Sequence, residues 1–249
     1  MASFRFRCSE CGTDYAEHAV ELVCPDCTRH QRPGGSTRGV LEVELTTLPS
    51  VWPAAPMSSP EALAEFLPLA SPQSWPPLAV GGTPLLEVER LRRHLGTPAL
   101  WIKDDTRNPS GSTKDRASAL VVAKAIEYRR DTVAAASTGN AATALAAIAA
   151  ASGIRAVLFV PASVPETKLV QMLAYGADVL PIDGTYDQAF ELCVQACQRF
   201  GWYNRNTALN PFTIEGKKTA ALEIAAAITP ECPDVVVVPV GDGVIIAGI

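Results

Sequence analysis

Short apolar runs alternate with alanine-rich or amphipathic stretches from about residue 80 onward. Apolar runs without polar alternation indicate strands that are covered on both faces. They predict strands at 100–103, 132–136, 155–160, 177–182 and 235–240. The stretches between them predict helices at 114–130, 140–152, 165–176, 185–200 and 216–228. Because this alternation favours parallel strands joined by right-handed crossovers, we expect an α/β fold of parallel sheets with flanking helices.

The first third of the chain has a different texture. Residues 1–45 carry cysteines and charges with little helical periodicity, and residues 46–80 are rich in proline. Proline-rich segments are stiff and extended. We therefore expect 46–80 to be a linker, with one short helix at 60–66, between a small amino-terminal segment and a main region at 81–249.

Composition excludes several classes of protein. The chain has 249 residues, of which 48% are hydrophobic and 19% charged, as in an ordinary globular protein. A net charge of −5 without blocks of like charge argues against nucleic acid or an anionic membrane as the partner. No apolar stretch is long enough to span a bilayer, and the first residues lack the apolar part of a secretory signal. A cytoplasmic protein is expected.

Four of the seven cysteines form two CxxC pairs, Cys8 with Cys11 and Cys24 with Cys27. In a reducing cytosol such pairs are more typical of a metal site than of disulfides. Two CxxC turns supply the four thiolates of a closed tetrahedral site, so we expect a small zinc ribbon that holds a structural zinc ion. Idle or redox-active thiols are the alternative.

A second motif, NPSGSTKDR, occupies residues 108–116. Its small residues form a tight turn, which places Lys114 in the first turn of the following helix. The positive end of the helix dipole disfavours an ammonium there, and a lowered pKa would make Lys114 a Schiff-base nucleophile. The same pattern also fits a solvated lysine at the start of a surface helix.

Two further turns follow predicted strands. Residues 137–140 are Ser, Thr, Gly and Asn at a helix start, where bare amides and hydroxyls bind a carboxylate or a phosphate. Simple N-capping by Ser137 or Asn140 is the alternative. At 241–243, two glycines allow the backbone to approach a phosphate, although Asp242 would repel it unless its side chain turned away.

Five motifs follow one another over residues 80–249: TPL, NPSGSTKDR, STGNAA, NPFTIEGKKT and VPVGDG. In this order they resemble the motifs of threonine synthases and related fold-type-II pyridoxal-phosphate enzymes. The cysteine segment also resembles the amino-terminal extension of some members. The resemblance implies a tryptophan-synthase-β-like fold with a smaller subdomain at roughly 132–205. It leaves a homodimer open as the assembly.

The resemblance also implies roles for the matching residues. Lys114 would bind pyridoxal phosphate through a Schiff base and then act as the general base. The cofactor's 3′-oxygen would bind Asn140, and its phosphate would lie along Gly241, Asp242 and Gly243. The substrate carboxylate would be held by Ser137, Thr138 and Gly139. Asn206 and Thr207 lie where threonine synthases place an Asn-Ser pair near the substrate phosphate.

Two departures from the family pattern bear on function. The family usually has an arginine where this chain has Thr213, and that guanidinium helps to hold the phosphate of O-phosphohomoserine. The Ser or Thr expected beside the pyridine nitrogen would lie beyond Ile249. The abrupt end soon after the strand predicted at 235–240 favours a truncated chain.

Three functions remain in competition. The favoured one is a pyridoxal-phosphate-dependent lyase that converts O-phosphohomoserine and water into threonine and phosphate. Thr213 favours a threonine or serine ammonia-lyase, or a β-replacement enzyme, instead. The abrupt end favours a non-catalytic fragment that still binds the cofactor. For either enzyme the expected partner is a small amino-acid substrate.

Overall fold

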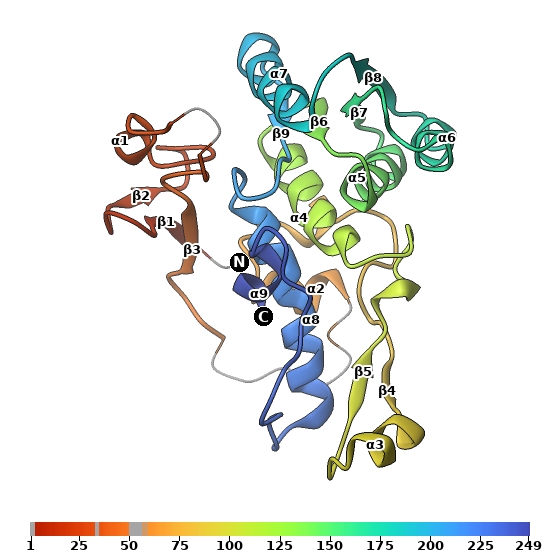
Figure 1. Cartoon of the computed structure of the whole chain (residues 1–249). Coiled ribbons are helices and arrows are strands. Elements are labelled where there is room, and N and C mark those ends of the chain that lie inside the picture. Colours follow the sequence, from red (N-terminus) through yellow and green to blue (C-terminus); the bar gives the residue numbers. More distant parts are fainter. Residues whose placement is uncertain (1–2, 33–34, 50–56, 58) are drawn as a thin grey trace.

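A computed structural model describes residues 3–32, 35–49, 57 and 59–249. Two long helices, α4 (Lys114–Glu127) and α8 (Phe212–Ile228), pack side by side at its centre. Figure 1 shows a sheet with its own helices at one end of this pair, a small strand pair at the other end, and the cysteine segment to one side. Part of the predicted linker, at 50–56 and 58, lies outside the described residues.

The main sheet has four parallel strands in the order β8-β7-β6-β9. Their bounds are β6 (Thr132–Ala136), β7 (Arg155–Pro161), β8 (Asp178–Ile182) and β9 (Tyr203–Asn204). The connections are made by α5 (Asn140–Ala151), α6 (Glu166–Ala174) and α7 (Tyr186–Phe200). The predicted α/β fold with parallel strands is confirmed.

Alternate residues of β6 belong to two different cores. Val133 and Ala135 pack with residues of α4 and α5, whereas Ala134 and Ala136 pack with residues of α7. Successive side chains of a strand point to opposite faces of the sheet. A strand between two helical layers is therefore expected to be apolar, which accounts for the apolar run at 133–136.

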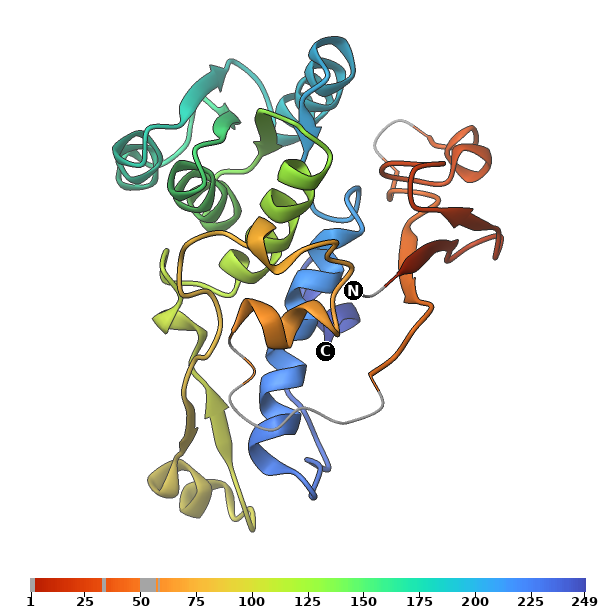
Figure 2. The ribbon, with the colours of Figure 1, turned by 180° about the vertical axis from the view of Figure 1, so that it is seen from behind.

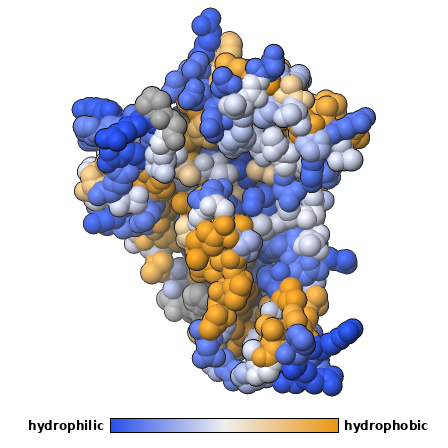
Figure 3. Space-filling model, viewed as in Figure 1, coloured by the Kyte–Doolittle hydropathy of each residue, from blue (hydrophilic) through white to orange (hydrophobic). Residues whose placement is uncertain are grey.

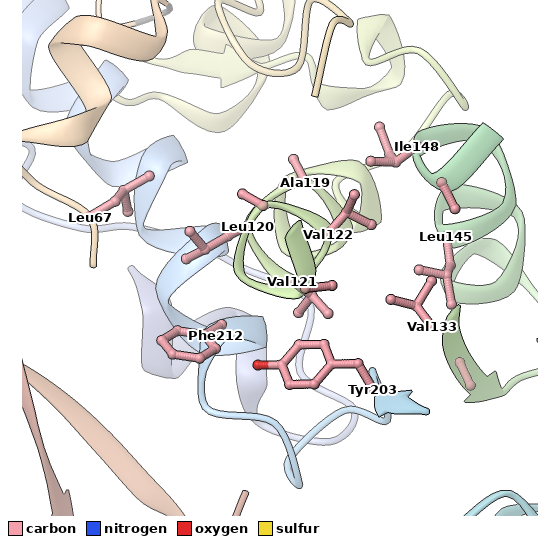
Figure 4. Packing of buried hydrophobic residues seen from close by; sticks show 14 of the residues in the cluster. Leu67, Ala119, Leu120, Val121, Val122, Val133, Leu145, Ile148, Tyr203 and Phe212 are labelled. Carbon is pink, nitrogen blue, oxygen red and sulfur yellow. The ribbon is translucent and has the colours of Figure 1, made fainter. Parts of the chain in front are cut away.

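Gly216 allows α8 to approach α4 closely. A Cβ atom at Gly216 would lie 2.4 Å from the carbonyl oxygen of Arg116 and 2.8 Å from the Cα of Ala117. Buried apolar residues of one cluster lie about the two central helices (Figure 4), among them Leu67, Leu120, Val121, Tyr203 and Phe212. The absence of a side chain at Gly216 thus sets the distance between the two central helices.

Arg116, on α4, connects both central helices to Asp105, which lies in the short turn before α4. Its guanidinium is fully buried and donates to Asp105 at 2.7 and 2.8 Å and to Glu223 at 2.6 and 3.1 Å. It also donates to the hydroxyls of Thr83 and Thr219. Glu223 pairs in addition with Lys103 at 2.5 Å. Although burial opposes it, the hydrogen bonds and charges of the two carboxylates raise the pKa of Arg116.

The cysteine segment is a small antiparallel sheet that packs on the central helices. Its elements are β1 (Phe4–Cys8), β2 (Asp14–Ala16), α1 (Pro25–Thr28) and β3 (Leu41–Leu45), with strand order β2-β1-β3. The rings of Phe4 and Phe6 lie 5.8 and 5.6 Å from that of Phe212. Glu17 accepts a hydrogen bond of 2.8 Å from the buried Lys124 of α4.

The described part of the proline-rich segment contributes to the core. Helix α2 (Pro60–Ala64) confirms the short helix predicted there, and a 3₁₀ turn follows at Pro72–Ser74. Leu63, Leu67 and Leu69 are at most 1% exposed. Figure 2 views the molecule from the side of this segment. The segment is thus more than an extended connector, because its leucines supply apolar surface to the central helices.

One predicted strand forms in a different sheet. β5 (Trp101–Lys103) pairs antiparallel with β4 (Leu85–Glu87), and α3 (Glu89–Leu95) lies between them in the chain. This pair is separate from the parallel sheet. The apolar pattern at 100–103 predicted a strand correctly, but its partner and direction depend on a segment that the pattern did not identify.

Residues 235–240, predicted as a buried strand, form no strand in the described structure. Val235 and Val237 are 76% and 91% exposed. Figure 3 shows an apolar strip over this segment and α9 (Val244–Gly248). The backbone groups of a strand require a pairing partner, and none of the strands described here pairs with this run.

Helix α8 begins at Phe212, four residues before the predicted start. The Oδ1 of Asn210 accepts a hydrogen bond of 3.0 Å from the amide of Phe212, which satisfies a free donor at the helix start. Within the described ranges, every helix is too short or too polar to cross a lipid bilayer.

Candidate active site

Lys114 is the first residue of α4 and is half-buried. The preceding turn is held by Asn108, whose Oδ1 accepts from the amide of Gly81 at 2.9 Å, and by Asp115, whose Oδ2 accepts from the amide of Ser110 at 2.9 Å. No described residue accepts a hydrogen bond from the Lys114 ammonium. Burial lowers the pKa of Lys114, which gives it more neutral amine than a surface lysine has.

The turns after β6 and β9 lie side by side. β6 and β9 are parallel neighbours, so their carboxyl ends reach the same edge of the sheet. Asn206 joins the two turns, because its Oδ1 accepts from the amide of Ala136 at 2.7 Å. Its Nδ2 is buried and has no acceptor among the described residues. Asn206 therefore has a free donor at this edge, whereas Thr207 is partly exposed.

Ser137, Thr138 and Gly139 form the turn after β6, and Asn140 begins α5. Gly139 occupies the N-cap position, and no side chain of the described residues caps the helix. The alternative of N-capping by Ser137 or Asn140 is therefore wrong. Asn140 is exposed, and its Oδ1 accepts from Nζ of Lys168 at 3.0 Å, which turns this acceptor towards α6.

Gly241, Asp242 and Gly243 form the turn before α9. The Oδ1 of Asp242 accepts from the amide of Val244, the first residue of α9, at 3.1 Å, while Gly243 occupies the N-cap position. The charge of Asp242 nevertheless acts to raise the pKa values of Lys114, Arg205 and Lys217. This turn and the turn that carries Lys114 are therefore parts of one electrostatic neighbourhood.

Arg205 and Lys217 belong to the same neighbourhood, and the sequence analysis assigned them no role. Each is 1% exposed. The Nε of Arg205 donates to the hydroxyl of Ser118 at 3.2 Å, and Ser118 lies one helical turn after Lys114 on α4. Burial, together with the charges of Arg205 and Lys114, lowers the pKa of Lys217 to about 7.

The sequence feature that could have identified these two residues is their position in or beside the recognised motifs. Arg205 directly precedes Asn206, and Lys217 lies in the stretch 210–219. A charged residue inside such a motif is a candidate for burial at the site. Thr213, in contrast, is fully buried, and its hydroxyl donates to the carbonyl of Asn210 at 2.7 Å. It stabilises the start of α8.

The four paired cysteines lie together at one end of the cysteine segment. All four Sγ atoms of Cys8, Cys11, Cys24 and Cys27 are within 4.8 Å of one another. The Sγ–Sγ distances are 3.8 Å for Cys8 to Cys27 and 3.7 Å for Cys11 to Cys24. Four converging sulfur atoms can bind a metal ion.

Comparisons with known proteins agree with this geometry. Threonine synthase from Methanosarcina acetivorans is 36% identical over 245 residues, which cover 96% of this chain and 57% of that protein. Threonine synthase from Methanocaldococcus jannaschii is 38% identical over 179 residues, which cover 72% of this chain and 44% of that protein. The structure of maize serine racemase is 25% identical with a TM-score of 0.59, covering 67% of this chain and 50% of that one.

The chain thus spans about half the length of the curated relatives that it matches. A family model, described as pyridoxal-phosphate dependent enzyme, matches residues 77–249 and includes every part of the site around Lys114. On this match, the chain belongs to the family of pyridoxal-phosphate dependent enzymes.

Proposed function

We propose that this chain forms the Lys114 part of a pyridoxal-phosphate-dependent lyase that converts O-phosphohomoserine and water into threonine and phosphate. The observation that carries the proposal is Lys114 itself, half-buried at the start of α4, with a lowered pKa and with an ammonium that has no acceptor among the described residues. The identity of 36% and 38% to two threonine synthases supports this substrate over other amino acids.

The residues present fit the cofactor. Bound pyridoxal phosphate supplies an electron sink that stabilises negative charge on the substrate carbon. Lys114 provides the neutral amine to which the cofactor attaches, and it then accepts and returns the proton at the α-carbon. Asn140 and the turn Gly241, Asp242 and Gly243 are the proposed contacts to the ring oxygen and the phosphate.

The substrate is bound from the edge of the sheet. We assign its carboxylate to the amides and hydroxyls of Ser137, Thr138 and Gly139, where the uncapped start of α5 favours an anion. Asn206 and Thr207, on the neighbouring turn, are assigned to the substrate phosphate. The hydrogen bond from the amide of Ala136 to Asn206 fixes the positions of the two binding turns relative to each other.

A spectroscopic and a chemical measurement test the proposal. Pyridoxal phosphate should give the chain a visible absorbance band that survives desalting and is lost in Lys114→Ala. The band should persist in Lys218→Ala, because Lys218 pairs with Glu215 on α8. With O-phosphohomoserine, equal amounts of threonine and phosphate should be released. A band that persists in Lys114→Ala excludes the assigned lysine, and a lysine-dependent band without threonine release excludes the reaction.

Thr213 favours a second candidate, an ammonia-lyase that acts on threonine or serine. Its hydroxyl is used by Asn210, so this position offers no cation to a phosphate. The same preparation, supplied with threonine or serine, would then release ammonia and a 2-oxo acid. Release of these products, without turnover of O-phosphohomoserine, would establish the second candidate over the first.

We also propose that the four paired cysteines bind a structural zinc ion. Tetrahedral zinc with Zn–S bonds of about 2.3 Å requires sulfur atoms about 3.8 Å apart, which agrees with the 3.7 and 3.8 Å found here. Purified protein should contain one zinc ion per chain, and Cys24→Ser should lose both zinc and thermal stability. The exposed Cys232 offers a control, since Cys232→Ser should keep both. Protein that is stable without zinc contradicts the proposal.

A further inference from the structure

Arg205 and Lys217 are buried cations whose hydrogen-bond donors are only partly used. Each side chain is 1% exposed. The Nη2 of Arg205 and the Nζ of Lys217 have no hydrogen-bond partner in the described part of the chain, and neither has the Nδ2 of Asn206. All three groups are donors. A ligand that complements them must therefore present several acceptors.

The hydrogen bonds that Arg205 does make orient its guanidinium without neutralising it. Its Nε donates to Ser118 at 3.2 Å and its Nη1 donates to Thr207 at 3.0 Å, and both acceptors are hydroxyls. A hydroxyl that accepts from Arg205 still has its own proton to donate. The hydroxyl of Thr207 can therefore still act as a donor.

Negative charge around these cations is insufficient. Among the described residues, the charge of Asp242 acts to raise the pKa of Lys217, while Arg205 and Lys114 lower it as like charges. Asp242 and Asp115 act to raise the pKa of Arg205, but burial outweighs them. Asp242 is exposed, and its Oδ1 already accepts a hydrogen bond from the amide of Val244. Burial of cations without counter-ions is unfavourable, and burial accordingly lowers the pKa values of Arg205 and Lys217. A bound dianion would remove this imbalance.

We propose that Arg205 and Lys217 form a binding site for a phosphate monoester dianion. A phosphate offers three terminal oxygens to several donors, and a guanidinium can bind two of them at once. Only the source of the phosphate rests on the proposed function. The cofactor and O-phosphohomoserine each carry such a group, and the substrate's phosphate would receive from these residues the positive charge that Thr213 does not provide.

The first experiment measures the binding of inorganic sulfate, a dianion that does not titrate near neutral pH, by calorimetry. We compare the unmodified chain with Arg205→Met and Lys217→Met, which keep most of the apolar part of the side chain and remove the charge. Each should bind sulfate about tenfold more weakly or worse, because a charge-assisted hydrogen bond is lost. Lys218→Met is the matched control, since Lys218 pairs with Glu215 and should not affect sulfate.

Two further binding comparisons identify which compound supplies the phosphate. If it is the substrate's, both variants keep their affinity for pyridoxal phosphate, read from the Lys114-dependent absorbance band, but no longer bind O-phosphohomoserine more tightly than homoserine. If it is the cofactor's, both variants lose the preference for pyridoxal phosphate over pyridoxal.

Unchanged sulfate affinity, together with unchanged preferences for both phosphate compounds, would overturn the proposal. Should methionine prevent folding at either position, Arg205→Gln and Lys217→Gln provide neutral, polar replacements for the same comparison. Sulfate binding requires neither the cofactor nor turnover. Its result is therefore separable from failure of the lyase assay, which would count against the proposed function alone.

Discussion

Two buried arginines of this protein, Arg116 and Arg205, have opposite electrostatic surroundings. All three guanidinium nitrogens of Arg116 donate to the carboxylates of Asp105 or Glu223. The guanidinium of Arg205 donates only to hydroxyls, and one of its nitrogens has no partner within the described residues. The carboxylates raise the pKa of Arg116 in spite of burial, whereas burial lowers the pKa of Arg205.

The difference separates a cation that holds the fold from one that is prepared for a ligand. Both residues are 1% exposed or less, so burial does not distinguish them. Their partners do. A buried ion pair is strongly destabilised when one member is removed, while a buried charge without a partner already opposes folding. Helix α4 contacts both centres, through Arg116 itself and through Ser118.

The largest expected effect is on stability at Arg116. Arg116→Met leaves the partly buried Asp105 without its cation and the buried Glu223 with Lys103 alone, and it should reduce the free energy of unfolding by about 3–5 kcal/mol. Arg205→Met should change it by less than about 1 kcal/mol, in either direction, because no carboxylate loses a partner. Urea unfolding of both variants measures the two changes. Equal losses of stability in the two variants would contradict the proposed difference between Arg116 and Arg205.

A substitution at Gly216 should have a smaller effect on stability, and it should affect the surroundings of both Arg116 and Lys217. In Gly216→Ala, the new Cβ would lie 2.4 Å from the Arg116 carbonyl oxygen, and the forced separation of α8 from α4 should cost about 1–3 kcal/mol. Sulfate binding should weaken as well, because Lys217 moves with α8. For stability, Gly241→Ala is the matched control, since its Cβ would meet nothing within 4 Å. A fully stable Gly216→Ala protein contradicts this account of the helix contact.

Lys217 gives the smallest effect between neighbouring pH values, as a gradual dependence of stability on pH. Its pKa is about 7 in the folded chain, against an ordinary value of 10.5. Between these values the unfolded chain keeps a proton that the folded chain has lost, so this group makes stability rise with pH, by at most about 1.4 kcal/mol per unit. Stability curves of the unmodified chain and Lys217→Met should therefore converge as pH increases from about 7 to 10.5.

The neighbouring charges require a control for that measurement. Arg205, Asp242 and Lys114 all act on Lys217, and Lys114 itself has a lowered pKa. The same comparison made in a Lys114→Met background removes the second titrating lysine. A difference between the two proteins that does not change with pH would show that Lys217 is not a buried, unpaired ammonium.

Local patterns predicted most of the elements correctly. The strand at 132–136 has the predicted bounds, and α5 ends one residue before the predicted end. Helix α7 has a capping box between Thr185 and Gln188 and ends at Gly201 in the left-handed conformation. These signals lie within a few residues of one another, so the sequence contains them completely. The cysteine pairs and the lysine motif are local in the same sense.

Local patterns could not predict which strands pair or which buried charges are neutralised. β5 has the composition of a strand, but its antiparallel partner is found only in the folded chain, and the apolar run at 235–240 has no partner among the described strands. Arg116 and Arg205 carry the same charge and are both buried. Only the fold brings Glu223 to the first and leaves the second with hydroxyls.

The sequence by itself therefore determined the α/β alternation, the cysteine pairs and the position of Lys114 at a helix start, because each depends on neighbouring residues. The tertiary structure alone decided which strands pair and which buried cations lack a counter-ion. The physical reason is that hydrogen-bond and charge compensation in a low-dielectric interior depends on groups far apart in the chain, as Arg116 and Glu223 are.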